Sequence, residues 1–285
     1  MKKNENKPVT LVVTDLDGTL LTSDKNVSEK NKEAIRKLKE HGILFGIASG
    51  RPVESGLILC KNWGIEDSIS FLIGMNGGVL YDTRCKEKET YSILPGHLIW
   101  KILEYYKDFP DLHAEVMVGN DRYVSYSTPE TLENARLYGE NEIIVDLKEF
   151  LDTHNVNKLI LRSKPEDQEK VAAIARTIDL PGITHFSTSD VLYEFVDPDI
   201  NKGFGLQQAC KHFGLNLDNV AAFGDENNDL EMLMLAGQSV AMKNALPSVK
   251  AIAKTVSDYT NDEDALAHYI DEVILPAQPD KVVRN

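Results

Sequence analysis

The sequence has few cysteines, and they are not arranged for disulfides or for a metal. Only Cys60, Cys85 and Cys210 occur among its 285 residues. Their odd number and scattered positions are typical neither of a disulfide framework nor of a cysteine-based metal motif. We therefore interpret all three as buried thiols of a protein from a reducing, cytoplasmic compartment.

Positive charge and long apolar runs are also scarce. The net charge is −14, with 31 Lys and Arg against 45 Asp and Glu. Nucleic acids and anionic membrane surfaces are bound by clustered Lys and Arg, so we expect neither as a partner. No apolar run approaches the length that spans a bilayer, and residues 1–10 lack the apolar core of a signal peptide. An anionic substrate would need a local cationic pocket, for which a metal ion is the simplest source.

Short apolar segments that alternate with helical patterns predict an α/β fold. Residues 11–14 and 43–48 are nearly continuous apolar runs, which is typical of parallel strands buried on both faces. Between them Ser28 can cap a helix whose apolar stripe ends at Gly42. Another strand at 71–73 continues the alternation, so we expect a doubly wound, mainly parallel, Rossmann-like sheet. Ligands of such sheets bind beyond the carboxyl ends of the strands.

The pattern changes between about residues 85 and 196. Alternating strands and interspersed helices there are typical of an antiparallel α+β module. The strand and helix pattern resumes with a helix at 202–213 and an apolar strand at 220–223. We therefore expect a core domain formed by residues 1–84 and 197–285, interrupted by an inserted α+β cap domain at 85–196.

Four polar clusters follow the predicted sheet strands or begin the next helix. Because the carboxyl ends of parallel strands share one edge of a sheet, we expect the clusters to meet in one crevice. A single Asp-x-Asp is common in solvated loops and helix caps, so the convergence carries more weight than any one cluster. The clusters are Asp15-Leu16-Asp17-Gly18-Thr19, Ser49-Gly50-Arg51, Lys202 and Gly224-Asp225-Glu226-Asn227-Asn228-Asp229.

These residue types suit the transfer of a phosphoryl group. Carboxylates crowded into one crevice repel each other unless a cation lies among them, and oxygen ligands without Cys or His favour a hard cation such as Mg²⁺. Lys202, the Ser49 hydroxyl and loop amides can bind a phosphate. Asp15, at the end of a strand, can attack phosphorus in line. Asp17 can protonate the leaving alcohol and later deprotonate the attacking water.

In this order, the clusters resemble the four motifs of the haloacid dehalogenase-like superfamily, and in particular its Cof-type, type IIB phosphatases. Asp15-Leu16-Asp17-Gly18-Thr19-Leu20 resembles motif one, and Ser49-Gly50-Arg51-Pro52 resembles motif two. Asn201-Lys202-Gly203 and the stretch from Gly224 to Asp229 resemble motifs three and four. The insertion at 85–196 matches the place and size of the α/β cap in that family.

The resemblance implies a role for each matching residue. Asp15 would be the nucleophile and a metal ligand, and Asp17 the general acid/base whose backbone carbonyl also meets the metal. Asp225 would ligate Mg²⁺, and Asp229 would hold the water shell of the metal. The phosphoryl group would be bound by Ser49, Lys202 and Asn228.

Three further residues, Asn76, Gly50 and Arg51, are candidates for contact with the substrate. Asn76 matches a family position near the pocket, although the role of a simple turn residue explains it equally well. Arg51 can steer a phosphate, but pairing with carboxylates is the more common role of an arginine at a helix start.

The sequence therefore predicts a magnesium-dependent hydrolase of small phosphate monoesters, such as sugar phosphates or similar metabolites, that forms an aspartyl-phosphate on Asp15. A phosphomutase of the same superfamily would use Asp15 and Asp17 in the same way, so the motifs leave this alternative open. A non-enzymatic phospho-acceptor module would also explain an acidic pocket with a lysine. It would explain neither Asp17 in the position of an acid nor a cap large enough to enclose a ligand.

Overall fold

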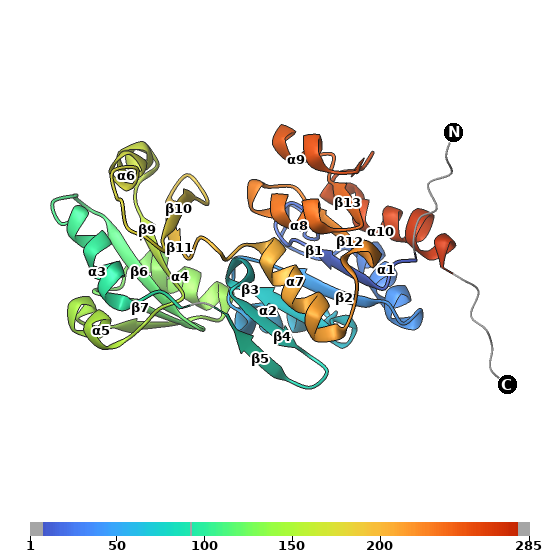
Figure 1. Ribbon diagram of the computed structural model, residues 1–285, viewed down its shortest axis with the longest axis horizontal. Coiled ribbons are helices and arrows are strands. Elements are labelled where there is room, and N and C mark those ends of the chain that lie inside the picture. Colours follow the sequence, from blue (N-terminus) through green and yellow to red (C-terminus); the bar gives the residue numbers. More distant parts are fainter. Residues whose placement is uncertain (1–7, 92, 279–285) are drawn as a thin grey trace. The chain divides into compact units, whose positions relative to one another are not determined.

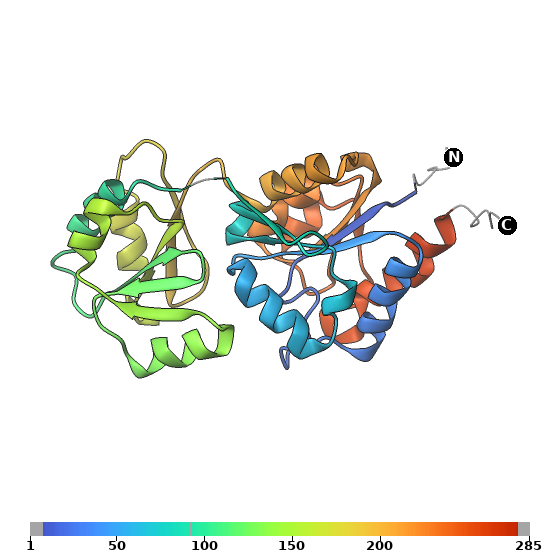
Figure 2. The ribbon, with the colours of Figure 1, turned by 90° about the horizontal axis from the view of Figure 1, so that it is seen from below.

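The computed structural model describes residues 8–91 and 93–278, and their contacts divide the chain into two compact units (Figures 1 and 2). The first unit combines Met1–Arg51, Leu59–Glu89 and Asn201–Asn285, and the second combines Pro52–Ile58 and Thr90–Ile200. This division differs from the expected domains by a few residues at each end of the insertion and by the segment Pro52–Ile58. That the second unit acts as a cap stays a prediction.

The first unit is built on a mainly parallel sheet. Its strands are β1 (Leu11–Thr14), β2 (Leu44–Ala48), β3 (Phe71–Gly74), β4 (Val79–Asp82), β5 (Glu87–Thr90), β12 (Val220–Gly224), β13 (Gln238–Ala241) and β14 (Thr255–Val256). Their order across the sheet is β14-β13-β12-β1-β2-β3-β4-β5. Each neighbouring pair from β14 to β3 is parallel, whereas β4 runs antiparallel to β3. The expected α/β fold with a mainly parallel sheet is confirmed.

Helices cover both faces of this sheet (Figure 2). They are α1 (Glu29–Glu40), α7 (Lys202–Phe213), α8 (Leu230–Leu235), α9 (Pro247–Ile252) and α10 (Ala265–Tyr269). The helix α2 (Val53–Trp63) is divided between the two units, which meet in the chain at Leu59. The helices α7 and α8 pack on one face, and α1 and α10 pack on the other. The predicted ends of α1 are confirmed, because the Ser28 side chain accepts a hydrogen bond from the Asn31 N–H and Gly42 turns the chain at φ 71°.

The second unit contains a separate, mainly antiparallel sheet. Its strands are β6 (His113–Val118), β7 (Asp121–Val124), β8 (Asn141–Ile144), β9 (Lys158–Arg162), β10 (Thr184–Ser187) and β11 (Leu192–Val196). They follow the order β10-β11-β9-β6-β7-β8, and within residues 93–278 only β7 and β8 pair in parallel. Its helices are α3 (Gly96–Tyr105), α4 (Pro129–Tyr138), α5 (Leu147–Thr153) and α6 (Gln168–Ala175).

One face of this second sheet forms an apolar core with α3, α5 and α6. Val116, Leu159 and Phe195 from three neighbouring strands are fully buried against residues of these helices, including Ile99 and Val171. Each such side chain contributes about 1.5–3 kcal/mol when it leaves water. The apolar residues alternate along the strands, so the intervening side chains point to the other face.

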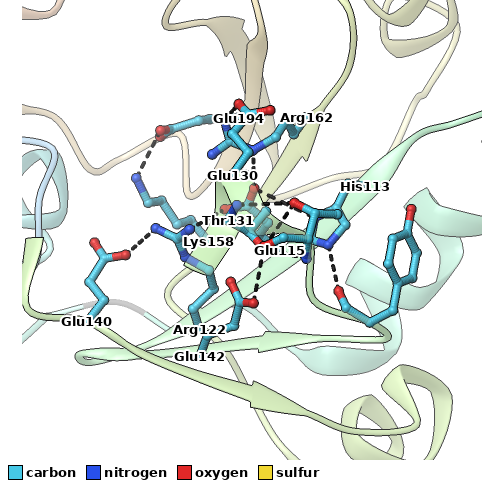
Figure 3. A network of polar contacts seen from close by, with 12 residues as sticks. His113, Glu115, Arg122, Glu130, Thr131, Glu140, Glu142, Lys158, Arg162 and Glu194 are labelled. Carbon is cyan, nitrogen blue, oxygen red and sulfur yellow. Dashed lines mark hydrogen bonds and ion pairs between the residues drawn. The ribbon is translucent and has the colours of Figure 1, made fainter. Parts of the chain in front are cut away.

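Charged side chains occupy that other face and form a buried ionic network (Figure 3). At its centre the Glu115 carboxylate accepts a hydrogen bond from Arg162 Nε at 2.6 Å and forms an ion pair with Arg122 Nη1 at 3.2 Å. His113 Nδ1 lies 3.7 Å from the same carboxylate. Buried charges are costly unless they are paired, so the network must stay complete to be stable. Its members are His113, Glu115, Arg122, Glu140, Lys158, Arg162 and Glu194.

Two expectations from composition can be compared with the structure. Cys60 and Cys210 are buried as predicted, but Cys85 is exposed because it lies in the turn between β4 and β5. The prediction of a buried thiol is therefore wrong at Cys85. Within the described ranges 8–91 and 93–278, each helix is too short or too polar to cross a membrane.

Candidate active site

The first sheet brings the predicted catalytic clusters to one of its edges. The central strand β1 pairs with β12 on one side and β2 on the other, and the Asp15 N–H extends the first pairing by donating to the Phe223 carbonyl at 3.0 Å. As a result, carboxylate oxygens of Asp15, Asp225 and Asp229 lie within 4.8 Å of one another. The convergence expected from the strand pattern is therefore present in the structure.

Lys202 lies among these carboxylates. It begins α7, whose first turn is capped by the Asn201 side chain accepting from the Phe204 N–H at 2.8 Å. The Lys202 ammonium donates to Asp15 Oδ1 at 2.5 Å and to Asp229 Oδ1 at 2.6 Å, and the side chain is fully buried. Burial alone would lower the pKa of Lys202, but the two carboxylates raise it above its ordinary value. The lysine is thus a fixed positive charge inside the site.

Asp229 connects the lysine to the loop that carries Asp225. Its second carboxylate oxygen accepts hydrogen bonds from the N–H groups of Asp225 at 2.9 Å and Glu226 at 3.1 Å. The loop fits tightly around it, since a Cβ added at Gly224 would lie 2.5 Å from the Asp229 Cβ. Asp229 is fully buried. It therefore holds both Lys202 and the Asp225 loop, and its expected contact with the water shell of a metal stays a prediction.

The carboxyl groups of Asp15 and Asp225 both have pKa values above their ordinary range. Burial, together with repulsion from Asp229 and Asp225, raises the pKa of Asp15 to about 8 despite the opposing effect of Lys202. Burial and the neighbouring Asp229 also raise the pKa of Asp225 to about 6, although the Thr19 hydroxyl donates to Asp225 Oδ1 at 2.5 Å. Three carboxylates share one ammonium, so the site has the charge and the oxygen ligands to attract a further hard cation.

Asp17 is placed differently from the other acidic residues. Its carboxylate pairs with Arg51 Nη2 at 2.8 Å and with Lys25 Nζ at 2.7 Å, and its side chain is 41% exposed. Burial acts in the opposite direction, but Arg51 and Lys25 hold the pKa of Asp17 below its ordinary value. Of the two interpretations of Arg51, the structure favours pairing with a carboxylate over a direct contact with phosphate.

The loops after β2 and β3 complete the edge. The Ser49 side chain accepts a hydrogen bond from the Arg51 N–H at 3.2 Å, and the Ser49 carbonyl accepts one from the Asn76 N–H at 3.0 Å. Asn76 is buried and left-handed, with φ 52°, and its side-chain oxygen accepts from Asn228 Nδ2 at 3.4 Å. A Cβ at Gly50 would lie 3.1 Å from the same oxygen. Asn76 therefore joins Ser49, Gly50 and Asn228 at this edge.

Three residues at this edge were not predicted as site residues. Thr19 binds Asp225, Lys25 binds Asp17, and the Asn244 side chain donates to the Gly18 carbonyl at 2.8 Å. Thr19 lies within the first cluster, but no spacing rule indicates its partner 206 positions away. Lys25 and Asn244 are polar residues of loops, for which solvent exposure is the ordinary expectation.

Comparison with known proteins identifies the class of protein that has this fold and site. The chain matches the haloacid dehalogenase-like hydrolase family over residues 12–270, and it belongs to this family. The 5-amino-6-(5-phospho-D-ribitylamino)uracil phosphatase YitU of Bacillus subtilis is 29% identical over 271 residues, which cover 94% of this chain and 98% of that protein. The HMP-PP phosphatase of Klebsiella pneumoniae is 27% identical over 284 residues, with coverages of 95% and 99%.

Solved structures agree with this assignment. A haloacid dehalogenase-like hydrolase from Bacteroides thetaiotaomicron superposes with a TM-score of 0.81 at 28% identity, covering 92% of this chain and 98% of that one. A sugar phosphatase of subclass IIB has the same fold, with a TM-score of 0.76 at 21% identity. The predicted Cof-type family and the enzyme class, phosphoric monoester hydrolase, are confirmed. The roles of the individual site residues stay predictions.

Proposed function

We propose that the protein hydrolyses small phosphate monoesters with the help of Mg²⁺, through an aspartyl-phosphate formed on Asp15. The observation that carries this proposal is the buried group of Asp15, Asp225, Asp229 and Lys202. It combines a carboxylate at a strand end, a fixed ammonium for phosphate oxygens and further carboxylates for a metal.

The donor set fits Mg²⁺. The ligand atoms of the three carboxylates lie within 4.8 Å of one another, and all are oxygens, which hard cations prefer. Asp15 and Asp225 would hold the ion, with Asp229 and the backbone carbonyl of Asp17 as further candidates. When bound, Mg²⁺ supplies positive charge that stabilises the phosphoryl oxygens.

The side chains of the protein then divide the reaction into two displacements. An Asp15 oxygen attacks phosphorus, the bond to the alcohol breaks, and an acyl phosphate forms; water then attacks the same phosphorus and regenerates Asp15. Lys202 neutralises charge on the transferred group, because its ammonium is only 2.5 Å from the Asp15 oxygen. The Ser49 hydroxyl and the Asn228 amide would donate to the remaining phosphoryl oxygens.

Asp17 would carry the proton in both displacements. As the general acid it protonates the departing alcohol, and as the general base it takes a proton from the attacking water. In the structure its carboxylate is bound by Arg51 and Lys25. A carboxyl group that is to donate a proton must first leave these two cations, so we propose that this pairing represents the resting position of the acid.

The names of the relatives support small phosphorylated metabolites as substrates. One acts on a phosphoribitylamino-uracil and another on HMP-PP, and both relatives cover nearly the whole chain. We propose that the second unit provides specificity as a cap and that sugar phosphates or similar compounds are the substrates.

Release of inorganic phosphate from a panel of such compounds tests this function. The wild-type protein with Mg²⁺ should release phosphate from at least one small monoester, and Asp15→Asn should release none. Transfer of the group to a second position of the substrate without release would indicate the phosphomutase. A long-lived phospho-Asp15 without turnover would indicate the phospho-acceptor module.

A further inference from the structure

A second group of metal-ligating residues lies within the first unit, and the proposed reaction does not use it. Atoms of Asp82, Cys85 and His212 that can each bind a metal lie within 4.8 Å of one another. Asp82 ends β4 and is 2% exposed, Cys85 follows in the turn to β5, and His212 lies in the last turn of α7. The group thus joins the hairpin of β4 and β5 to a helix that packs on the sheet.

The imidazole of His212 has a carboxylate oxygen at each of its two nitrogens. Its Nε2 lies 3.0 Å from Asp82 Oδ2, and its Nδ1 lies 2.9 Å from Glu89 Oε1. A neutral imidazole has one N–H and can donate to only one of them. A second positive charge must therefore lie between the other ring nitrogen and its carboxylate oxygen. This charge is either a second proton on the ring or a metal ion.

The surroundings favour a metal at the Nε2 side. Metal-binding histidines commonly donate their other ring N–H to a carboxylate, and Glu89 is placed to accept that hydrogen bond. The Nε2 atom then points toward Asp82, with the Cys85 thiol within reach. Oxygen, sulfur and nitrogen together form a donor set typical of Zn²⁺, whereas Mg²⁺ prefers oxygen alone.

We propose that Asp82, Cys85 and His212 bind a divalent transition-metal ion, with Zn²⁺ as the best match, and that Glu89 orients the histidine. In a tetrahedral site with bonds of about 2.0–2.1 Å, the ligating oxygen and nitrogen lie about 3.3 Å apart. The observed 3.0 Å between Asp82 Oδ2 and His212 Nε2 needs only a small widening. Water would complete the tetrahedron, because exposed Cys85 lies at the surface.

The charges of the group balance with the metal bound. The ion replaces the Nε2 proton of the imidazolium and the proton of the Cys85 thiol, so two protons leave as two positive charges arrive. Arg84 can stay in place, because its Nε and Nη2 donate to the Asp82 carboxylate at 3.0 and 2.8 Å. Its guanidinium also stacks over Phe213, 4.5 Å from the ring centre. The arginine thus orients the carboxylate through both oxygens, including the Oδ2 that faces His212, as outer ligands of metal sites do.

Titration with Co²⁺ under reducing conditions tests the site without any measurement of phosphatase activity. Cobalt bound through a thiolate has a sulfur-to-metal charge-transfer absorption band, whereas cobalt in the all-oxygen crevice has none. We expect one such band per chain in the wild type, and the same band in Asp225→Asn. Cys85→Ser changes an exposed residue by one atom and should abolish it, while Cys210→Ala, a matched control for a buried thiol on α7, should keep it.

Competition by Zn²⁺ measures how strongly the site binds and whether Glu89 takes part. Glu89→Gln should weaken Zn²⁺ binding about 10- to 100-fold, as loss of an outer carboxylate typically does. Stoichiometric Zn²⁺ should raise the melting temperature of the wild type but not of Cys85→Ser, because only the former binds it in the folded state. Absence of the band at saturating Co²⁺, or equal Zn²⁺ affinity in wild type and Cys85→Ser, would overturn the proposal.

Discussion

Replacement of Glu115 by Gln removes the central negative charge of the ionic network and keeps the size of the side chain. Glu115 is fully buried, and its carboxylate faces Arg162 at 2.6 Å and Arg122 at 3.2 Å. The substitution leaves both guanidinium groups with fewer counter-charges where water cannot replace them (Figure 3). Loss of one partner from a buried ion pair costs about 3–5 kcal/mol. We therefore expect the second unit to unfold at a much lower urea concentration.

The pKa of Glu115 gives a similar value for the stability that its charge contributes. Burial acts to raise it, but His113, Arg122 and Arg162 lower the pKa from 4.5 to about 2. A shift of this size corresponds to about 3 kcal/mol. Because the pKa is lower in the folded state, this stability is present above pH 4.5 and is lost as the pH falls toward 2. The difference between wild type and Glu115→Gln should therefore be smaller at acidic than at neutral pH.

Tryptophan fluorescence can follow the second unit alone. The chain has two tryptophans, and Trp100 packs against the core of the second unit while Trp63 belongs to the first. In a Trp63→Phe background, urea unfolding followed by Trp100 fluorescence measures how much Glu115→Gln lowers the free energy of unfolding of the second unit. Glu130→Gln is the matched control, because its ion pair with Arg162 has a carboxylate that is 65% exposed and should cost less than about 1 kcal/mol. If Glu115→Gln lowered the free energy of unfolding by no more than Glu130→Gln does, the reasoning from burial would be refuted.

Three further predictions concern the reaction. Thr19→Val should lower kcat/KM about 10- to 100-fold, because it removes the hydrogen bond that holds Asp225, and a hydrogen bond to a charged group contributes about 1.5–3 kcal/mol. Unchanged kinetics would contradict the role given to Thr19. Chelation should abolish phosphate release, Mg²⁺ should restore it, and Ca²⁺, with its longer bonds, should restore it poorly; full activity after exhaustive chelation would rule out the metal. Asp17→Asn should slow the phosphorylation step more for alkyl than for aryl phosphates, because a phenolate leaves without a proton. Equal losses in rapid-quench measurements would make Asp17 a positioning residue.

The convergence of the candidate catalytic residues could be predicted from the sequence because a rule of sheet geometry determines it. Apolar runs end abruptly at Asp15 and at Gly224, and the carboxyl ends of parallel strands share one edge. Once the runs are interpreted as parallel strands, Asp15, Asp225 and Lys202 must approach each other. The ends of α1 were predictable for a similar reason, since Ser28 and Gly42 act within one turn of the helix.

The pairings between side chains could not be predicted, because they depend on residues far apart in the sequence. Thr19 and Asp225 are 206 positions apart, and Lys158 and Glu194 are 36 apart. A charged residue in a strand is ordinarily expected to face water, and only the strand order places Glu115 beside Arg162. Cys85 was misjudged for another reason, since a cysteine is ordinarily expected to be buried and this one lies in the turn between β4 and β5.

The pairing of β1 with β12 also determines how late during synthesis the first sheet can form. Thr10 and Asn219, which flank this pairing, are 209 positions apart. A ribosome that adds about 5–20 residues per second leaves that edge of β1 without its partner for about 10–40 s. The strands of the second unit, all between Thr90 and Ile200, are completed within this interval.

The growing chain therefore carries a sheet for the second unit before it carries the proposed catalytic site. During that time β1 presents unpaired backbone groups, which makes the unfinished first unit a target for chaperones and for association with other chains. The carboxylates of Asp225 and Asp229 enter last. We infer that a partial product of translation that ends before Asp225 and Asp229 cannot hydrolyse phosphate esters, so the activity begins only after β12 and the loop that follows it have been made.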